Sequence, residues 1–156
     1  MERRTECIEY RRDGWAEIQY LGDQMDGLWT RYRKDGSKHW ERQYVGGRQT
    51  GYERTWDEAD RLIDEKWFLD GELHGTWRTW DSSGVLRQES NFVRGEQEGL
   101  QSWWDEAGNL VAQGTITAGV REGTFIADVL NAAETATKRM VLQFRGGQLL
   151  TDLHWG

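Results

Sequence analysis

The chain has 156 residues, enough for one domain, and carries 27 acidic against 20 basic residues for a net charge of −7. That balance argues against a nucleic-acid backbone as the main partner, and the single cysteine excludes a disulfide framework or a cysteine-based zinc site within one chain. Nineteen glycines, ten tryptophans and no proline indicate many tight turns between short strands.

The N-terminal segment, residues 1–26, is charged and contains no apolar run. It therefore predicts neither a secretory signal nor a membrane span, and we expect a cytoplasmic protein. Glu17 and Tyr20 occupy positions that recur further along the chain, so this segment is interpreted as a degenerate N-terminal cap of a repeat array.

The central part repeats with a period of 24 residues, which defines units at 27–50, 51–74, 75–98 and 99–122. Each unit opens on a glycine, and the same kind of residue returns at several fixed positions after it. The recurring positions are the glycines Gly27, Gly51, Gly75, Gly99 and Gly123, the aromatics Tyr32, Trp56, Trp80 and Trp104, the leucines Leu62, Leu86 and Leu110, the acids Glu41, Glu65 and Glu89, and the apolar residues Tyr44, Phe68, Phe92 and Ile116.

The residue pattern of each unit predicts a β-hairpin. The stretch Asp81–Gly84 has aspartate first and glycine fourth, as in a type I turn followed by a left-handed glycine. Pairing around that turn places Trp80 opposite Leu86, and the next unit places Trp104 opposite Leu110. Glycines about every ten residues and the lack of helical periodicity disfavour helices.

The last segment, residues 123–156, fits the repeat only with an insertion within 128–139. That insertion is interpreted as a longer hairpin or a short helix that caps the open edge of the sheet, with a functional loop as the alternative. The whole chain, 1–156, is then one all-β repeat domain. We predict an elongated, twisted antiparallel β-meander of about twelve short strands, built from tandem 24-residue hairpins.

The spacing from Phe92 through Gly95, Gly99, Trp104 and Gly108 to Leu110 resembles the MORN repeat. It is most similar to the bacterial MORN-repeat variant of YwqK-type antitoxin or immunity proteins. The resemblance covers roughly residues 14–125 and implies a scaffold, a dimerisation module, a lipid binder or an antitoxin. Asp60 at a turn-glycine position and the C-terminal insertion depart from the pattern.

No catalytic constellation emerges from the sequence. The histidines His39, His74 and His154 occupy different repeat positions and show no metal-binding spacing. We therefore expect no enzyme, no catalytic residue, no cofactor and no metal site.

Two sets of side chains are candidates for binding a protein partner. Glu17, Glu41, Glu65 and Glu89 lie two strands apart and predict a row that receives basic side chains, or else a row paired with nearby arginines such as Arg33 or Arg42. Trp29, Trp67 and Trp77 do not recur, and strand alternation predicts them on the face of the glutamates, opposite the Tyr32, Leu62 and Phe68 positions. The candidate partner-binding residues are Trp29, Glu41, Glu65, Trp67, Trp77 and Glu89.

These patterns favour a protein-binding module, an antitoxin or immunity protein that occludes a partner such as a basic toxin. The alternatives are a self-associating structural scaffold and, because net negative charge is repelled by anionic membrane, less readily a lipid-binding module.

Overall fold

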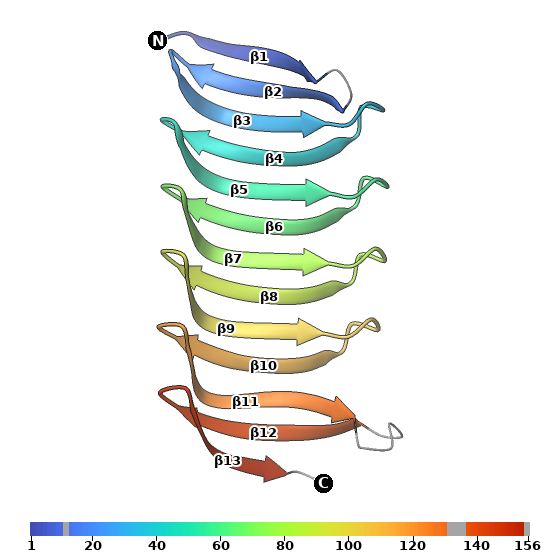
Figure 1. Ribbon diagram of the computed structural model, residues 1–156, viewed down its shortest axis with the longest axis vertical. Helices are drawn as coiled ribbons and strands as arrows, with labels where there is room; N and C mark the ends of the chain where they lie inside the picture. Colours follow the sequence, from blue (N-terminus) through green and yellow to red (C-terminus); the bar gives the residue numbers. More distant parts are fainter. Residues whose placement is uncertain (11–12, 131–136, 155–156) are drawn as a thin grey trace.

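The computed structural model describes residues 1–10, 13–130 and 137–154, which form one antiparallel sheet of thirteen strands in chain order (Figure 1). This confirms the predicted all-β meander, with one strand more than the sequence suggested. No helix capable of crossing a membrane occurs in these residues. The strands are β1 Arg3–Tyr10, β2 Gly14–Leu21, β3 Gln24–Tyr32, β4 Lys38–Val45, β5 Arg48–Trp56, β6 Leu62–Leu69, β7 Glu72–Trp80, β8 Leu86–Val93, β9 Glu96–Trp104, β10 Leu110–Thr117, β11 Val120–Leu130, β12 Thr137–Arg145 and β13 Gln148–His154.

The turns that follow β5, β7 and β9 share an aspartate at their first position, and they form what we call the aspartate-turn edge. In the turn after β7, the Asp81 carboxylate accepts hydrogen bonds from the backbone N–H groups of Ser83 and Val85 at 2.8 and 3.1 Å. The backbone N–H of Gly84 also donates to the carbonyl of Asp81 at 3.0 Å, and Trp80 pairs with Leu86. The predicted turn and register are therefore confirmed.

The opposite edge is made of two-residue turns, namely Gly46-Gly47, Asp70-Gly71, Arg94-Gly95 and Ala118-Gly119, and we call it the glycine-turn edge. Both residues of each turn have positive φ, as a type I′ hairpin turn requires. Each second glycine donates its N–H to a carbonyl of the preceding repeat, as Gly71 does to Gln49 at 2.8 Å. These turns stack in one column in Figure 1, so every repeat is fastened to the one before it.

The recurring glycines that open each unit lie at a sharp bend in β3, β5, β7 and β9. Between β6 and β7, Lys66 pairs with Trp77 and Phe68 pairs with Leu73. A single residue of β6, Trp67, therefore faces three residues of β7. Gly75 lies in the middle of those three with φ +72°, and the Trp67 side chain lies over it. At Gly51 the Gln43 side chain lies so close that a Cβ would meet it at 2.2 Å. Glycine is therefore required here by both φ and space.

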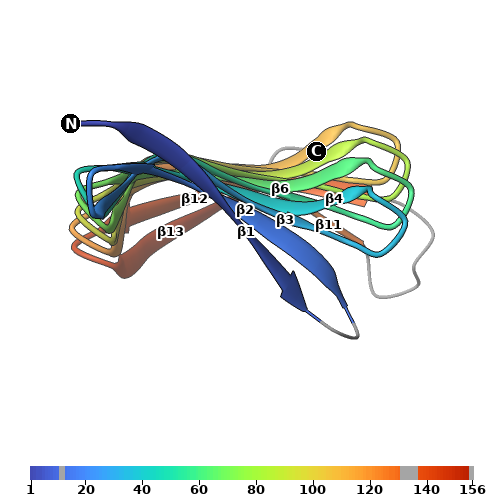
Figure 2. The ribbon, with the colours of Figure 1, turned by 90° about the horizontal axis from the view of Figure 1, so that it is seen from above.

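The sheet is a twisted single layer, and no second layer covers either face within the described residues (Figure 2). The apolar core is correspondingly small. Its largest cluster consists of Ile116, Phe125 and Phe144 near the C-terminal end, with Leu142 against it. The amide of Gln101 is fully buried and donates to the carbonyls of Asn91 and Gly99, both at 3.2 Å.

The C-terminal insertion is only partly described. Asp128 and Arg139 pair across β11 and β12 and their side chains form an ion pair at 2.7 Å, so the described residues extend the hairpin, as one of the predicted alternatives required. The proposed cap concerns the insertion within 128–139, of which residues 131–136 lie outside the described residues.

Candidate functional site

The pairing register assigns every central side chain to one of two faces, because paired residues on neighbouring antiparallel strands point to the same side. One face, the glutamate face, carries Glu17, Glu41, Glu65 and Glu89. The other, the phenylalanine face, carries Tyr44, Phe68, Phe92 and Phe144. Across the glutamate face one continuous row runs from strand to strand through Glu17, Thr30, Glu41, Arg54, Glu65, Arg78 and Glu89.

The predicted row of glutamates exists, but other residues of the chain stand between its members, and from Glu41 onward these are the basic Arg54 and Arg78. Arg54 Nε lies 2.7 Å from Glu65, and Arg78 Nε lies 2.7 Å from Glu89. Lys38 lies 2.7 Å from Glu41. The alternative prediction, that the glutamates are paired with arginines of the chain itself, is therefore correct for Glu65 and Glu89. It was wrong in its partners, since Arg42 pairs with Glu53 on the opposite face and Arg33 donates to the carbonyls of Lys38 and Trp56.

The predicted grouping of tryptophans with glutamates is wrong in part. Trp67 does share the glutamate face, because it lies two residues from Glu65 in β6. Trp29 pairs with Arg42 and Trp77 pairs with Lys66, which places both on the phenylalanine face. The six candidate residues therefore do not form one surface. Glu41, Glu65, Trp67 and Glu89 lie on one face, and Trp29 and Trp77 lie on the other.

The recurring aromatic position is also on the glutamate face, contrary to prediction. The Tyr32 hydroxyl donates to Glu17 at 3.4 Å, and burial together with the Glu17 charge raises the pKa of Tyr32. The reason is a β-bulge beside each aspartate turn. Trp56 pairs with Leu62 while Thr55 pairs with Asp64, so one extra residue, Ile63, shifts the alternation. Beyond it Glu65 shares the face of Leu62, and Phe68 points to the other side.

Trp29 and Trp77 are packed into the phenylalanine face. The Trp77 indole donates to Asp64 at 2.7 Å, and Lys66 Nζ lies 5.1 Å from the centre of the indole ring. Trp29 contacts Trp40 edge to face at 5.2 Å between ring centroids. These contacts give both side chains a role within the sheet.

Trp67 forms the wall of a hollow on the glutamate face. Its ring meets Tyr52 edge to face at 4.5 Å, and the Arg54 guanidinium lies over Tyr52 at 4.3 Å from the ring centroid. The hollow measures about 360 Å³, and its lining consists of Tyr52, Glu65, Trp67, His74, Gly75, Thr76 and Arg78. The equivalent positions of other repeats hold the smaller polar residues Gln19, Gln43 and Asn91, so Trp67 makes this repeat distinctive.

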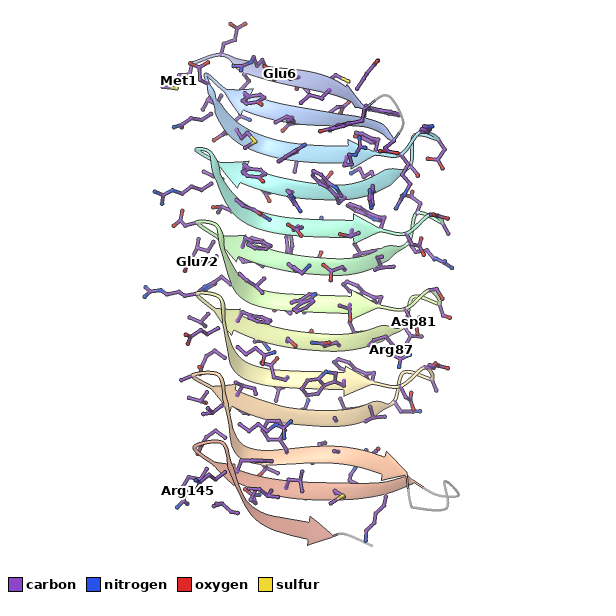
Figure 3. The ribbon with its side chains drawn as sticks, in the orientation of Figure 1. Met1, Glu6, Glu72, Asp81, Arg87 and Arg145 are labelled. Atoms are coloured by element: carbon purple, nitrogen blue, oxygen red, sulfur yellow. The ribbon has the colours of Figure 1, made fainter. Side chains whose placement is uncertain are left out.

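An exposed apolar strip runs along the glycine-turn edge of the same face, and sequence reasoning missed it. Its members are between 40% and 55% exposed, and their pairing places all of them on the glutamate face. We call this surface the glycine-turn margin, and it consists of Val45, Tyr52, Leu69, Val93, Leu100 and Val120. Figure 3 shows Glu72, the partner of Leu69, at this edge, and Asp81 at the opposite one.

A sequence signal for this margin was present. Val45, Leu69 and Val93 recur at 24-residue spacing, each directly before a turn at the glycine-turn edge. An apolar residue that returns beside an exposed turn has no core to enter in a single-layer sheet, so its recurrence indicates a surface role.

No group of three or more histidine, cysteine, aspartate or glutamate side chains within the described ranges is arranged to hold a metal ion. The glutamate face offers aromatic walls, exposed aliphatic side chains and charges that are largely paired within the sheet.

Comparison with known proteins finds a family match within two of the repeats. Residues 73–94 and 97–116 match the family described as MORN repeat variant, and the two matches begin 24 residues apart. This supports the MORN-repeat part of the resemblance. No curated protein matches the chain. MORN repeats are generally protein- or membrane-binding modules, and an all-β array of this kind is a binding or structural module.

Proposed function

We propose that the chain is a non-enzymatic protein-binding module that docks its partner on the glycine-turn margin. The observation that carries this proposal is the gathering of six exposed apolar side chains on one face, with Val45, Leu69, Val93 and Val120 beside the turns and Tyr52 and Leu100 further in. Scattered exposed apolar residues are ordinary, whereas apolar residues that recur on one face among charged ones such as Arg48, Glu72 and Glu96 are typical of an interaction surface.

The charge distribution favours a basic partner. Residues 1–50 contain ten basic and nine acidic residues, so the remaining 106 residues hold ten basic and 18 acidic ones, a net charge of −8. The margin lies almost entirely within that acidic part. A basic protein is steered toward such a field, and the apolar strip then supplies contact area once charges have brought the surfaces together.

On this basis, and on the resemblance to bacterial YwqK-type proteins, the finer proposal is an antitoxin or immunity protein. It would act by occlusion, covering a basic toxin with the glutamate face. The Trp67 hollow would accept an anchoring side chain of that toxin, since buried aromatic pockets are where binding energy concentrates.

The test is affinity capture from the native host, with bound proteins identified by mass spectrometry. The full chain is compared with Leu69→Glu, with Trp67→Gln, and with Ile8→Glu as a control. Ile8 is also exposed, but it lies on the opposite face of β1, where it pairs with Ala16. Trp67→Gln installs the residue found at the equivalent position of the preceding repeat, Gln43.

We expect one basic protein in stoichiometric amount with the full chain and with Ile8→Glu. Its recovery should fall at least about tenfold with Leu69→Glu, because a charge is then placed in an apolar contact. Equal recovery by all variants would show that the margin is not the docking surface.

A self-associating scaffold remains the second candidate, because the outer strands β1 and β13 each pair on one side only within the described residues. Leu149 and Leu150 in β13 are about half exposed, at 50% and 51%. Uncovered apolar edge strands pair readily with other strands. Light scattering across a concentration series tests this candidate, since a constant monomer mass at high concentration would rule it out.

A further inference from the structure

The glycine-turn margin has a regular spacing. Val45, Leu69 and Val93 end strands β4, β6 and β8, so each is separated from the next by two strand spacings, or about 10 Å. The turns that they precede stack in the column seen in Figure 1, and the twist of the sheet displaces them progressively sideways in Figure 2. A partner that contacts all three residues must therefore present apolar groups at intervals of about 10 Å along one line.

An α-helix meets that requirement. Its residues rise about 1.5 Å each, so every seventh residue returns to the same face after about 10.5 Å. In an extended strand, side chains of one face recur about every 6.8 Å, which does not match. We propose that the margin binds an amphipathic α-helix of a protein partner, which lies across the strands along the long axis of the sheet. This inference rests on the proposed function, which it refines by naming the partner element.

A second row of contacts fits the same helix. Tyr52, Trp67 and Leu100 lie on the same face, further from the turns than Val45, Leu69 and Val93. A helix with a heptad pattern carries two lines of apolar residues, at the a and d positions. One line would contact the aliphatic residues beside the turns, and the other would reach Tyr52, the Trp67 hollow and Leu100.

The charges along the margin specify the flanks of that helix. Glu72 and Glu96 pair with Leu69 and Val93, so each acid lies beside an aliphatic contact point on the same face. Both are exposed, and no ion pair within the described residues neutralises either of them. Lysine or arginine beside the apolar seam of the helix would therefore meet carboxylates at Leu69 and Val93, whereas beside Val45 an acidic residue of the helix would meet Arg48, as charged flanks do in helix pairing.

The experiment uses a synthetic peptide of four heptads with leucine at a and d and lysine or arginine among the remaining positions. The control peptide has the same composition, with leucine and charged residues alternating. Binding to the full chain is measured by isothermal titration calorimetry, and the change in peptide helicity by circular dichroism. Leu69→Glu is compared with Ile8→Glu, and with the double variant Leu69→Thr/Val93→Thr, because threonine occupies the equivalent position at Thr117.

We expect the heptad peptide to bind with gain of helicity, at least about tenfold more tightly than the alternating peptide. Leu69→Glu and the threonine double variant should weaken that binding by a similar factor, while Ile8→Glu leaves it unchanged. Equal binding of both peptides would overturn the inference, since it would reflect charge attraction alone. So would a heptad peptide whose binding survives both margin variants.

The host capture separates this inference from the proposed function. If a host protein is lost with Leu69→Glu but the heptad peptide does not bind, the docking surface stands and its occupant is not a helix. If neither host protein nor peptide responds to Leu69→Glu, the docking surface itself is wrong.

Discussion

Single aspartates at the aspartate-turn edge hold their turns through hydrogen bonds that need an ionised carboxylate or another acceptor. The side-chain amide and the backbone N–H of Asn109 donate to Asp105, and they lower the pKa of Asp105. At Asp57 the donors are the side chain and backbone of Arg61, with the same effect on its pKa. Each carboxylate is therefore more stable as an anion in the folded chain than in the unfolded one.

This linkage predicts acid-sensitive turns. Because the folded pKa of Asp105 is depressed, its contribution to stability is present above the unfolded pKa of about 3.9 and is lost as pH falls through the folded value. Asp105→Asn keeps an acceptor but cannot titrate. We expect Asp105→Asn to have a lower Tm than the parent at pH 7 and a smaller difference as pH falls toward 3. Thermal melts of both proteins from pH 7 to pH 3 provide the measurement.

Glu106→Gln serves as the control, because it removes the same charge from the same turn and its side chain is exposed. Its Tm difference from the parent should vary little across that range. A difference between Asp105→Asn and the parent that stayed constant down to pH 3 would contradict the linkage.

At position 114 the neighbouring Phe125 ring leaves space for glycine alone. A Cβ at this position would lie 2.1 Å from the ring of Phe125, which belongs to the core with Ile116 and Phe144. We expect Gly114→Ala to destabilise the fold by about 1–3 kcal/mol through overpacking, as measured by urea unfolding. The double variant Gly114→Ala/Phe125→Leu should lose less than the sum of the two single changes, because leucine leaves room for the new methyl group. Additive losses would show that the two positions do not compete for space.

At the scale of elements, the aspartate turns could be predicted from the sequence, whereas the β-bulges beside them could not. The aspartate turns follow from Asp81 and Gly84, whose side-chain chemistry and conformational freedom specify the loop, and the pairing of Trp80 with Leu86 followed correctly. The bulge beside each turn could not be predicted from the sequence. Its extra residue in β6, Ile63, has a side chain that is equally common at regular strand positions. One unrecognised residue reversed the faces predicted for everything beyond it.

The same error explains the mixed outcome for the candidate site. Glu65 and Trp67 were correctly placed together, since they lie on one strand with no bulge between them. Trp77 was misplaced because its position relative to Glu65 depends on pairing across strands. The recurrence of Leu69 and Val93 beside turns was a signal in the sequence, but it indicates exposure only once the sheet is known to have no second layer over it.

The type I′ turns contain non-glycine residues at positive φ, and these are sites for stabilisation. Ala118 has φ +48°, a conformation that is unfavourable for alanine and readily adopted by asparagine. We expect Ala118→Asn to stabilise the chain by about 0.5–1 kcal/mol in urea unfolding. The hydrogen bond from the N–H of residue 118 to Glu98, at 2.7 Å, does not depend on the side chain and should be kept.

Ala107→Asn is the matched control, because Ala107 is an exposed turn residue whose φ is not positive. Its stability should stay near that of the parent. Equal stabilisation by both substitutions would mean that backbone conformation at residue 118 is not the cause.

At the scale of the molecule, the sheet is a one-dimensional stack in which each strand pairs only with its neighbours in the chain. Stability in such an array is close to a sum of repeat terms and neighbour interfaces, and the outer strands have one interface instead of two. We expect amide hydrogen exchange to be slowest in β6–β9 and to quicken toward β1 and β13. Uniform protection along the chain, measured by mass spectrometry of peptic fragments, would instead indicate a single cooperative unit.

Strand order that follows chain order also bears on how the molecule is made. Every pairing closes a loop of only a few residues, so little loop entropy opposes each step, and the mean sequence separation of contacts is low. A hairpin can therefore form as soon as its residues leave the ribosome. Its first strand can then pair with the last strand of the hairpin already formed. During growth from the N-terminal end, the outer edge of β1 stays unpaired, and a second unpaired edge moves forward with synthesis until β13 is added.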